Sequence, residues 1–94
     1  MFSWHEAKNQ SNRKKHHVGF EAAMLVFHDP LHLSRLDIVE RGEQRWLTIG
    51  MAGNVLLLLV VHTLEDLGAD EPHIHIISAR RATRQEREIY EEGI

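Results

Sequence analysis

Three arginines surround a predicted helix start near the end of the chain. Thr83 and Glu86 have the spacing of a capping box, in which the threonine hydroxyl accepts the amide of Glu86 and the carboxylate accepts the amide of Thr83. The isoleucine-rich run 74–77 predicts a buried strand just before it, because β-branched side chains fit a pleated sheet. Guanidinium groups beside free helix amides favour an anion site, although a solvated junction is the alternative. The arginines are Arg80, Arg81 and Arg84.

A second basic cluster lies in the first fifth of the chain. Lys14 and Lys15 end a predicted helix and are followed by His16. A histidine with its ordinary pKa of about 6.5 can transfer protons at neutral pH, so His16 is a candidate acid or base. Arg45 precedes Trp46, an aromatic residue that either stacks on a base or fills the core, and the same alternatives apply to Tyr90.

The eight histidines also permit a metal hypothesis. His73 and His75 are two residues apart on a predicted strand and therefore share a face, and His16 or His17 is a conceivable third ligand. Against this, the chain has no cysteine and no HExxH motif. We therefore expect neither a metal nor another cofactor.

Composition indicates one globular domain of 94 residues without disulfides, and we expect it in the cytoplasm. The longest apolar run, Val55–Val61, is far shorter than the ~20 residues of a membrane-spanning helix, so no membrane association is expected. The net charge is −3. It is unevenly spread, because residues 1–20 are basic and residues 21–72 are acidic, which leaves local cationic patches for a phosphate-bearing partner.

The hydropathy pattern predicts helices at both ends of a sheet. Ser3 and Glu6 have capping-box spacing for a first helix, and Phe20 opens a second with a clear apolar face that ends before Pro30. Strands follow, one of them apolar on both faces and hence central. With these short connections we expect an α+β fold with an antiparallel four-stranded sheet, a β-meander. The predicted elements are a short strand at Phe2–Trp4, helices Trp4–Lys15 and from Phe20, an edge strand Leu31–Val39, strands Arg45–Met51, Val55–Thr63 and from His73, and a last helix from Thr83.

Ordered blocks along nearly the whole chain resemble the BrnT family of type II toxin–antitoxin toxins. Among them are Asn12-x-x-Lys15-His16-x-Val18-x-Phe20-Glu21, Glu43-x-Arg45-Trp46-Leu47-Thr48-Ile49-Gly50 and Ile76-Ile77-Ser78-Ala79-Arg80-Arg81-Ala82-Thr83-x-x-Glu86-x-x-x-Tyr90. The resemblance implies a RelE-like fold and a ribonuclease that arrests translation. It also implies neutralisation by a BrnA-like ribbon-helix-helix antitoxin, through which the complex binds operator DNA. His5 and His75 stand where the family commonly has Asp and Arg.

From this resemblance we expect metal-independent RNA cleavage, in which the 2′-hydroxyl of the substrate attacks the adjacent phosphate. The alternatives are a non-catalytic module that binds RNA or an acidic protein, and a metal-dependent enzyme built on His73 and His75. The residues expected to act in catalysis are Lys15, His16, Arg45, Arg80 and Arg81, and those expected to contact RNA are Lys14, Trp46, Arg84 and Tyr90.

Overall fold

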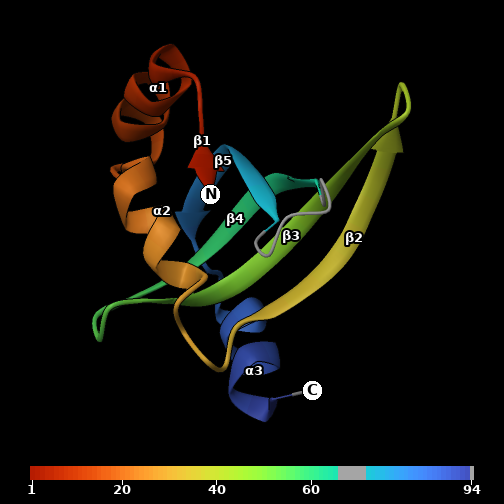
Figure 1. The fold of residues 1–94 in the computed structure, drawn as a ribbon. Coiled ribbons are helices and arrows are strands. Elements are labelled where there is room, and N and C mark those ends of the chain that lie inside the picture. Colours follow the sequence, from red (N-terminus) through yellow and green to blue (C-terminus); the bar gives the residue numbers. More distant parts are fainter. Residues whose placement is uncertain (66–71, 94) are drawn as a thin grey trace.

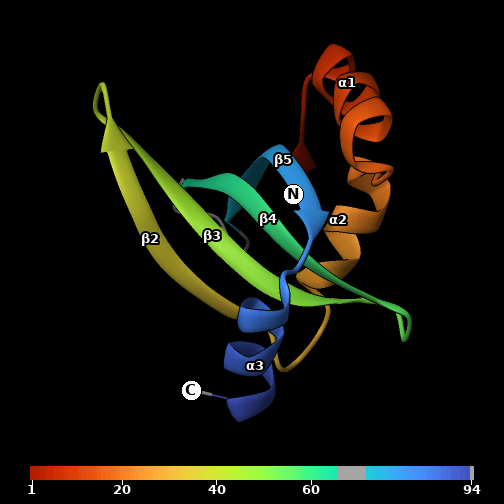
Figure 2. The same cartoon turned by 180° about the vertical axis from the view of Figure 1, so that it is seen from behind.

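A curved five-stranded sheet organises the molecule, with two helices on one face and one on the other (Figures 1 and 2). The computed structural model describes residues 1–65 and 72–93. The strand order is β1-β5-β4-β3-β2. The elements are β1 (Phe2–Ser3), α1 (Glu6–His16), α2 (Phe20–Val26), β2 (Leu33–Glu40), β3 (Glu43–Ala52), β4 (Leu56–Glu65), β5 (His73–Arg81) and α3 (Arg84–Glu92).

The expected all-antiparallel, four-stranded sheet is wrong in one respect. Strands β2 to β5 do form an antiparallel meander with β2 at its edge, but β1 adds a fifth strand parallel to β5. Phe2 pairs with Ile74 and Ser3 with His75. Two residues are too few to show an alternating pattern, so only the distant partner strand defines β1 as part of the sheet.

Strand β4 is central and buried on both sides, as its apolar run predicts. Leu58 and Val60 are fully buried in the core cluster that α2 covers. Leu57 and Leu59 lie on the opposite face, in a second apolar cluster that Tyr90 of α3 contacts. The sheet therefore has two cores, and the smaller one lies under α3.

Helix α2 packs directly on β3 at Gly50. A Cβ atom at this position would lie 2.9 Å from Val26 Cγ1 and 3.1 Å from the Val26 carbonyl oxygen. The missing side chain thus permits close approach of helix and sheet. Helix α2 begins at Phe20 as predicted and ends at Val26, before Pro30.

The predicted capping box at the first helix is wrong, whereas the one at the last helix is confirmed. Helix α1 begins at Glu6 with His5 as its N-cap, and no side chain caps it. The Ser3 hydroxyl belongs to β1 and contacts histidines of β5 instead. At α3, the amide of Glu86 donates to Thr83 Oγ1 over 3.2 Å and the amide of Thr83 donates to Glu86 Oε1 over 2.8 Å.

Buried asparagines attach the polar helix α1 to the sheet. Asn12 Nδ2 donates to the carbonyl of Ala79 over 2.8 Å, and the Ala79 amide donates to Asn12 Oδ1 over 3.2 Å. Asn9 Oδ1 accepts the amide of Phe20 and so joins α1 to α2. Helix α1 thereby covers the edge of β5 beyond the short β1. No helix in the described part of the chain is long and apolar enough to cross a membrane.

Candidate functional site

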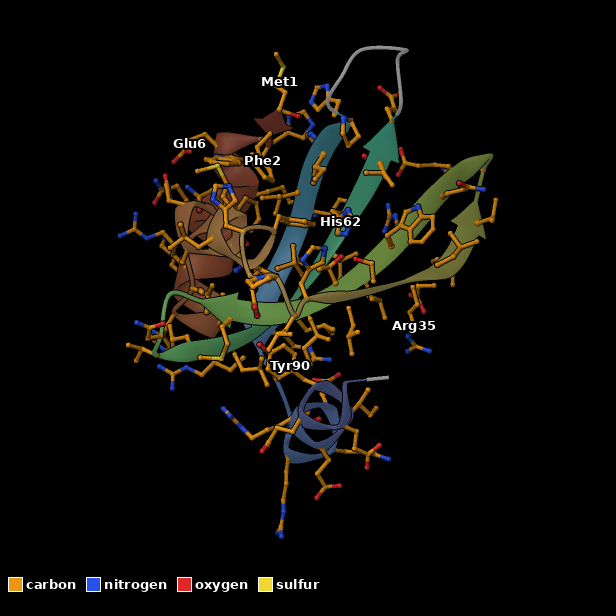
Figure 3. All side chains as sticks on the ribbon, turned by 60° about the horizontal axis from the view of Figure 1, so that its bottom comes forward. Met1, Phe2, Glu6, Arg35, His62 and Tyr90 are labelled. Carbon is orange, nitrogen blue, oxygen red and sulfur yellow. The ribbon has the colours of Figure 1, made fainter. Side chains whose placement is uncertain are left out.

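A groove lies between α3 and the face of the sheet that α1 and α2 leave open. It encloses a cavity of about 350 Å³. Figure 3 shows Arg35 and Tyr90 on this side of the sheet, while His62 points to the other side. The floor is apolar and the rim is charged. The lining residues are Leu33, Ser34, Arg35, Leu47, Ile49, Leu59, Glu86 and Ile89.

Arg80 of β5 lies beside this groove, opposite the lining residue Leu59, and forms a two-pronged ion pair with the lining residue Glu86. Its Nη1 and Nη2 atoms donate to Oε1 and Oε2 of Glu86, each over 2.8 Å. The hydrogen bonds from Arg80 hold the pKa of Glu86 below its usual range, and the same bonds raise the pKa of Arg80. Both groups are therefore ionised at neutral pH. Sequence reasoning identified Glu86 only as a helix cap, since its pairing depends on how α3 folds back.

Arg35 is a groove residue that sequence reasoning missed. It lies on β2 opposite Leu47, and Leu33, two residues earlier, shares its face. Within the described residues, no hydrogen bond or ion pair engages the Arg35 side chain. The available signal is its period-two spacing from Leu33, but in an edge strand with an irregular hydropathy pattern that spacing does not distinguish the two faces.

The structure does not gather the predicted catalytic residues into one cluster. Lys14, Lys15 and His16 end α1, which packs beside β5 on the face opposite α3. Arg81 follows Arg80 on a strand, so the two side chains leave on opposite faces. In the described part of the chain no hydrogen bond or ion pair joins Arg80 to α1. Of these residues, Arg80 is the one that pairs with a side chain lining the groove, Glu86.

Arg45 lies on the groove face but farther along the sheet. Its strand neighbour Ile49 is opposite Leu59, the cross-strand partner of Arg80. Four residues of β3 separate Ile49 from Arg45, about 13 Å along the strand. Arg45 Nε is 3.5 Å from Glu43 Oε1. Arg45 and Arg80 are thus too far apart to bind one phosphate together. Acting jointly, they would contact different parts of the RNA.

The predicted RNA-contacting residues are also dispersed. Trp46 is paired with His62 on the helix-bearing face, and its Nε1 atom is buried with no hydrogen-bond partner in the described residues. Tyr90 packs on the smaller core and donates its hydroxyl to Asp29 over 2.6 Å. Arg84 is almost fully exposed on the outside of α3, with Glu88 Oε1 at 3.9 Å. Their roles toward RNA stay predictions.

His73 and His75 converge on Ser3 rather than on a set of metal ligands. Ser3 Oγ is 2.7 Å from His73 Nε2 and 2.8 Å from His75 Nδ1. The neighbouring ring is that of His5, 5.0 Å from the His75 ring, and not the expected third ligand from the end of α1. In residues 1–65 and 72–93 no group of three or more suitable side chains is placed to hold a metal ion. Burial, with the nearby His5 and His73, lowers the pKa of His75.

Fold and groove together define a small α+β protein whose groove carries Arg35 and the Arg80–Glu86 ion pair at its rim. The family model "Ribonuclease toxin, BrnT, of type II toxin-antitoxin system" matches residues 4–86. The chain belongs to this family. Its structure is similar to the crystal structure of the Brucella abortus ribonuclease toxin BrnT, with a TM-score of 0.61 and 25% identity, covering 89% of this chain and 99% of that one. A search of curated proteins finds no match. Likeness to RelE stays a prediction.

Proposed function

We propose that this chain is an endoribonuclease toxin that cleaves RNA without a metal ion and thereby inhibits translation. The observation that carries the proposal is the match to a ribonuclease toxin family over residues 4–86. The groove supports it, because Arg35 lines an apolar floor with its charge unpaired among the described residues, and the Arg80–Glu86 ion pair lies at the same groove. Such a groove suits a phosphate flanked by bases.

In the proposed reaction the 2′-oxygen attacks the adjacent phosphorus and the bond from phosphorus to the 5′-oxygen breaks. The 2′-hydroxyl loses a proton, the departing 5′-oxygen gains one, and the products are a 2′,3′-cyclic phosphate and a 5′-hydroxyl end. Arg80 stabilises the charge that develops on the phosphate, which requires a guanidinium held in a fixed place. The catalytic roles expected of Lys15, His16, Arg45 and Arg81 stay predictions. Proton transfer by His16 at the phosphate that Arg80 holds would require the RNA to reach the opposite face of the sheet, where α1 ends.

The test is RNA cleavage by the purified protein in the presence of EDTA. Removing one preorganised donor typically lowers a rate by about 10²–10³-fold, so Arg80→Ala should lose cleavage and growth arrest while its circular dichroism spectrum stays unchanged. Arg87→Ala is the matched control, because Arg87 is an exposed arginine on α3, the helix that carries Glu86. Activity lost with the chelator would favour the metal-dependent alternative, and equal losses in both variants would mean that only diffuse charge matters.

The proposed partner is a BrnA-like antitoxin whose acidic segment covers the basic surface around Arg80 and Arg84. A ribbon-helix-helix domain on that partner would bind operator DNA, and the complex would act in the cytoplasm. Co-expression should yield a stable complex that Arg80→Glu together with Arg84→Glu weakens, because opposite charges steer and orient association. A complex that tolerates both changes would place the interface elsewhere.

A second candidate function is a non-catalytic module that binds RNA or an acidic protein. The observation that favours it is the separation of His16 from the groove: His16 ends α1, on the face opposite α3, and no histidine is among the residues that line the groove in the described part of the chain. RNA that is bound by the wild-type protein but remains uncut after prolonged incubation would support this module.

A further inference from the structure

We propose that Glu86 is a positioning residue, whose carboxylate fixes one edge of the Arg80 guanidinium and thereby presents the other edge to an RNA phosphate. The inference rests on the proposed function and deepens it. Glu86 would then have two roles: it caps α3, and it positions the guanidinium of Arg80.

The hydrogen bonds of Arg80 define which edge is free. Nη1 and Nη2 donate to the two oxygens of Glu86, and Nη1 also donates to the carbonyl of Arg81 over 3.2 Å. A guanidinium carries five N–H groups, so these bonds use three of them. The remaining two, on Nε and Nη2, lie along the second edge, whose spacing matches two oxygens of one phosphate.

The carboxylate is fixed too firmly to act as a displaceable substitute for phosphate. Glu86 Oε1 also accepts the amide of Thr83 over 2.8 Å, and the backbone of Glu86 is tied to the Thr83 hydroxyl. A phosphate that displaced Glu86 would have to break the ion pair and the helix cap together. The side chains of Arg80 and Glu86 are 39% and 24% exposed, so separating the pair would leave the carboxylate, the more buried of the two charges, incompletely solvated.

Helix α3 itself is anchored one turn further on. Tyr90, four residues after Glu86, donates its hydroxyl to Asp29 in the loop after α2. The chain of contacts from Asp29 through Tyr90 to Glu86 therefore holds the carboxylate at a constant position above β5. Rigid placement of this kind is what a group that stabilises transition-state charge requires.

The experiment compares Glu86→Gln with Thr83→Ala. Both variants weaken the capping box, but only the first removes the ion pair with Arg80. Misplacement of a reacting group by about 1 Å can cost about 10²-fold, so we expect Glu86→Gln to lower kcat of RNA cleavage about 10–100-fold with a smaller change in KM. Thr83→Ala should stay within about threefold of wild type. Glu86→Asp, which keeps the charge but shortens the reach, should resemble Glu86→Gln and serves if that variant does not fold.

A double variant separates positioning from other effects. In an Arg80→Ala background, Glu86→Gln should change the residual rate less than twofold, because the residue it positions is gone. Equal losses in Glu86→Gln and Thr83→Ala would show that Glu86 is only a cap, and tighter RNA binding by Glu86→Gln would show that the carboxylate competes with phosphate. Either result overturns the inference. Full activity of Arg80→Ala would instead remove Arg80 from the proposed function.

Discussion

The hydroxyl of Tyr90 donates to Asp29 Oδ2 over 2.6 Å and thereby fastens the last helix to the loop after α2. The same oxygen accepts the amide of Met51 over 2.8 Å, and Oδ1 accepts that of Leu31. Partial burial acts to raise the pKa of Asp29, but the hydrogen bonds from Met51, Tyr90 and Leu31 outweigh it and lower the pKa. One carboxylate thus joins α2, β3 and α3.

Tyr90 should titrate at an unusually high pH. Its hydrogen bond to the Asp29 carboxylate, with smaller contributions from burial and charge repulsion, raises its pKa to about 12. Tyr90 is the only tyrosine of the chain, so absorbance near 295 nm reports it directly. Asp29→Asn should return the midpoint toward 10, and far-ultraviolet circular dichroism of the same samples distinguishes titration from unfolding. A wild-type midpoint near 10 in folded protein would contradict the contact.

The same contact should stabilise the fold over a defined pH range. A tyrosine whose pKa is higher in the folded state contributes stability below its unfolded pKa of 10, and loses it as pH rises toward about 12. We expect Tyr90→Phe to cost about 1–2 kcal/mol at pH 7, since the hydrogen bond has a charged acceptor but is partly exposed. Urea denaturation at pH 7 and 10.5 should show that the difference between wild type and variant shrinks at the higher pH.

His62 should make the protein sensitive to mild acid. It is 2% exposed, with Nε2 at 2.6 Å from Thr48 Oγ1 and Nδ1 at 3.0 Å from the Thr63 carbonyl. Burial lowers its pKa from 6.5, because the charged form is poorly solvated there. The unfolded chain then binds more protons than the folded one, so stability is complete above pH 6.5 and falls as pH decreases below it.

Denaturation curves at pH 7.5, 6.5 and 5.5 test this expectation. The non-titrating variant His62→Gln should have lower stability at every pH but a shallower dependence on pH. The dependence should not vanish, because the pKa of His75 is lowered as well and acts with the same sign. Equal slopes in the two proteins would mean that the imidazole of His62 accepts a proton in the folded state without cost.

The central strand offers a direct test of the sheet order. Leu58 is fully buried under α2, so Leu58→Ala should cost ~2–5 kcal/mol of unfolding free energy. Val55, in the turn before β4, is 82% exposed, and Val55→Ala should cost less than about 0.5 kcal/mol. Urea denaturation measures both. A loss below about 0.5 kcal/mol for Leu58→Ala would place β4 at the surface.

Elements with a local signature were predictable from the sequence. The doubly apolar run of β4, the apolar face of α2 and the capping box of Thr83 and Glu86 each depend on residues within a few positions of one another, and all three are confirmed. The capping pattern at Ser3 and Glu6 has the same spacing but gives no cap. There, the serine hydroxyl is hydrogen-bonded to two histidines that lie 70 and 72 residues later in the chain. The local sequence gives no sign of these distant partners.

The candidate site was harder to predict because side-chain direction depends on the register of the sheet. A register shift between Val61 and His62 interrupts the pairing of β4 with β5, and another between Leu36 and Ile38 interrupts that of β2 with β3. Alternation counted along one strand therefore does not show which residues of the next strand share its face. Proximity in sequence suggested that Arg80 and Arg81 act together, whereas the strand directs them to opposite faces.

The hydrogen bonds between Asn12 and Ala79 also limit the order in which the elements can fold while the chain is being synthesised. Strands β2 to β5 form an antiparallel meander of neighbouring strands, which can pair as they emerge. Strand β1 and the asparagine face of α1, although synthesised first, have their partners on β5, 67 to 72 residues later. Strand β1 and helix α1 must therefore wait for their partner until almost the whole chain is made, whereas α2 can already pack on β3. A truncated chain that lacks β5 would accordingly have no partner for α1, and it would also lack Arg80.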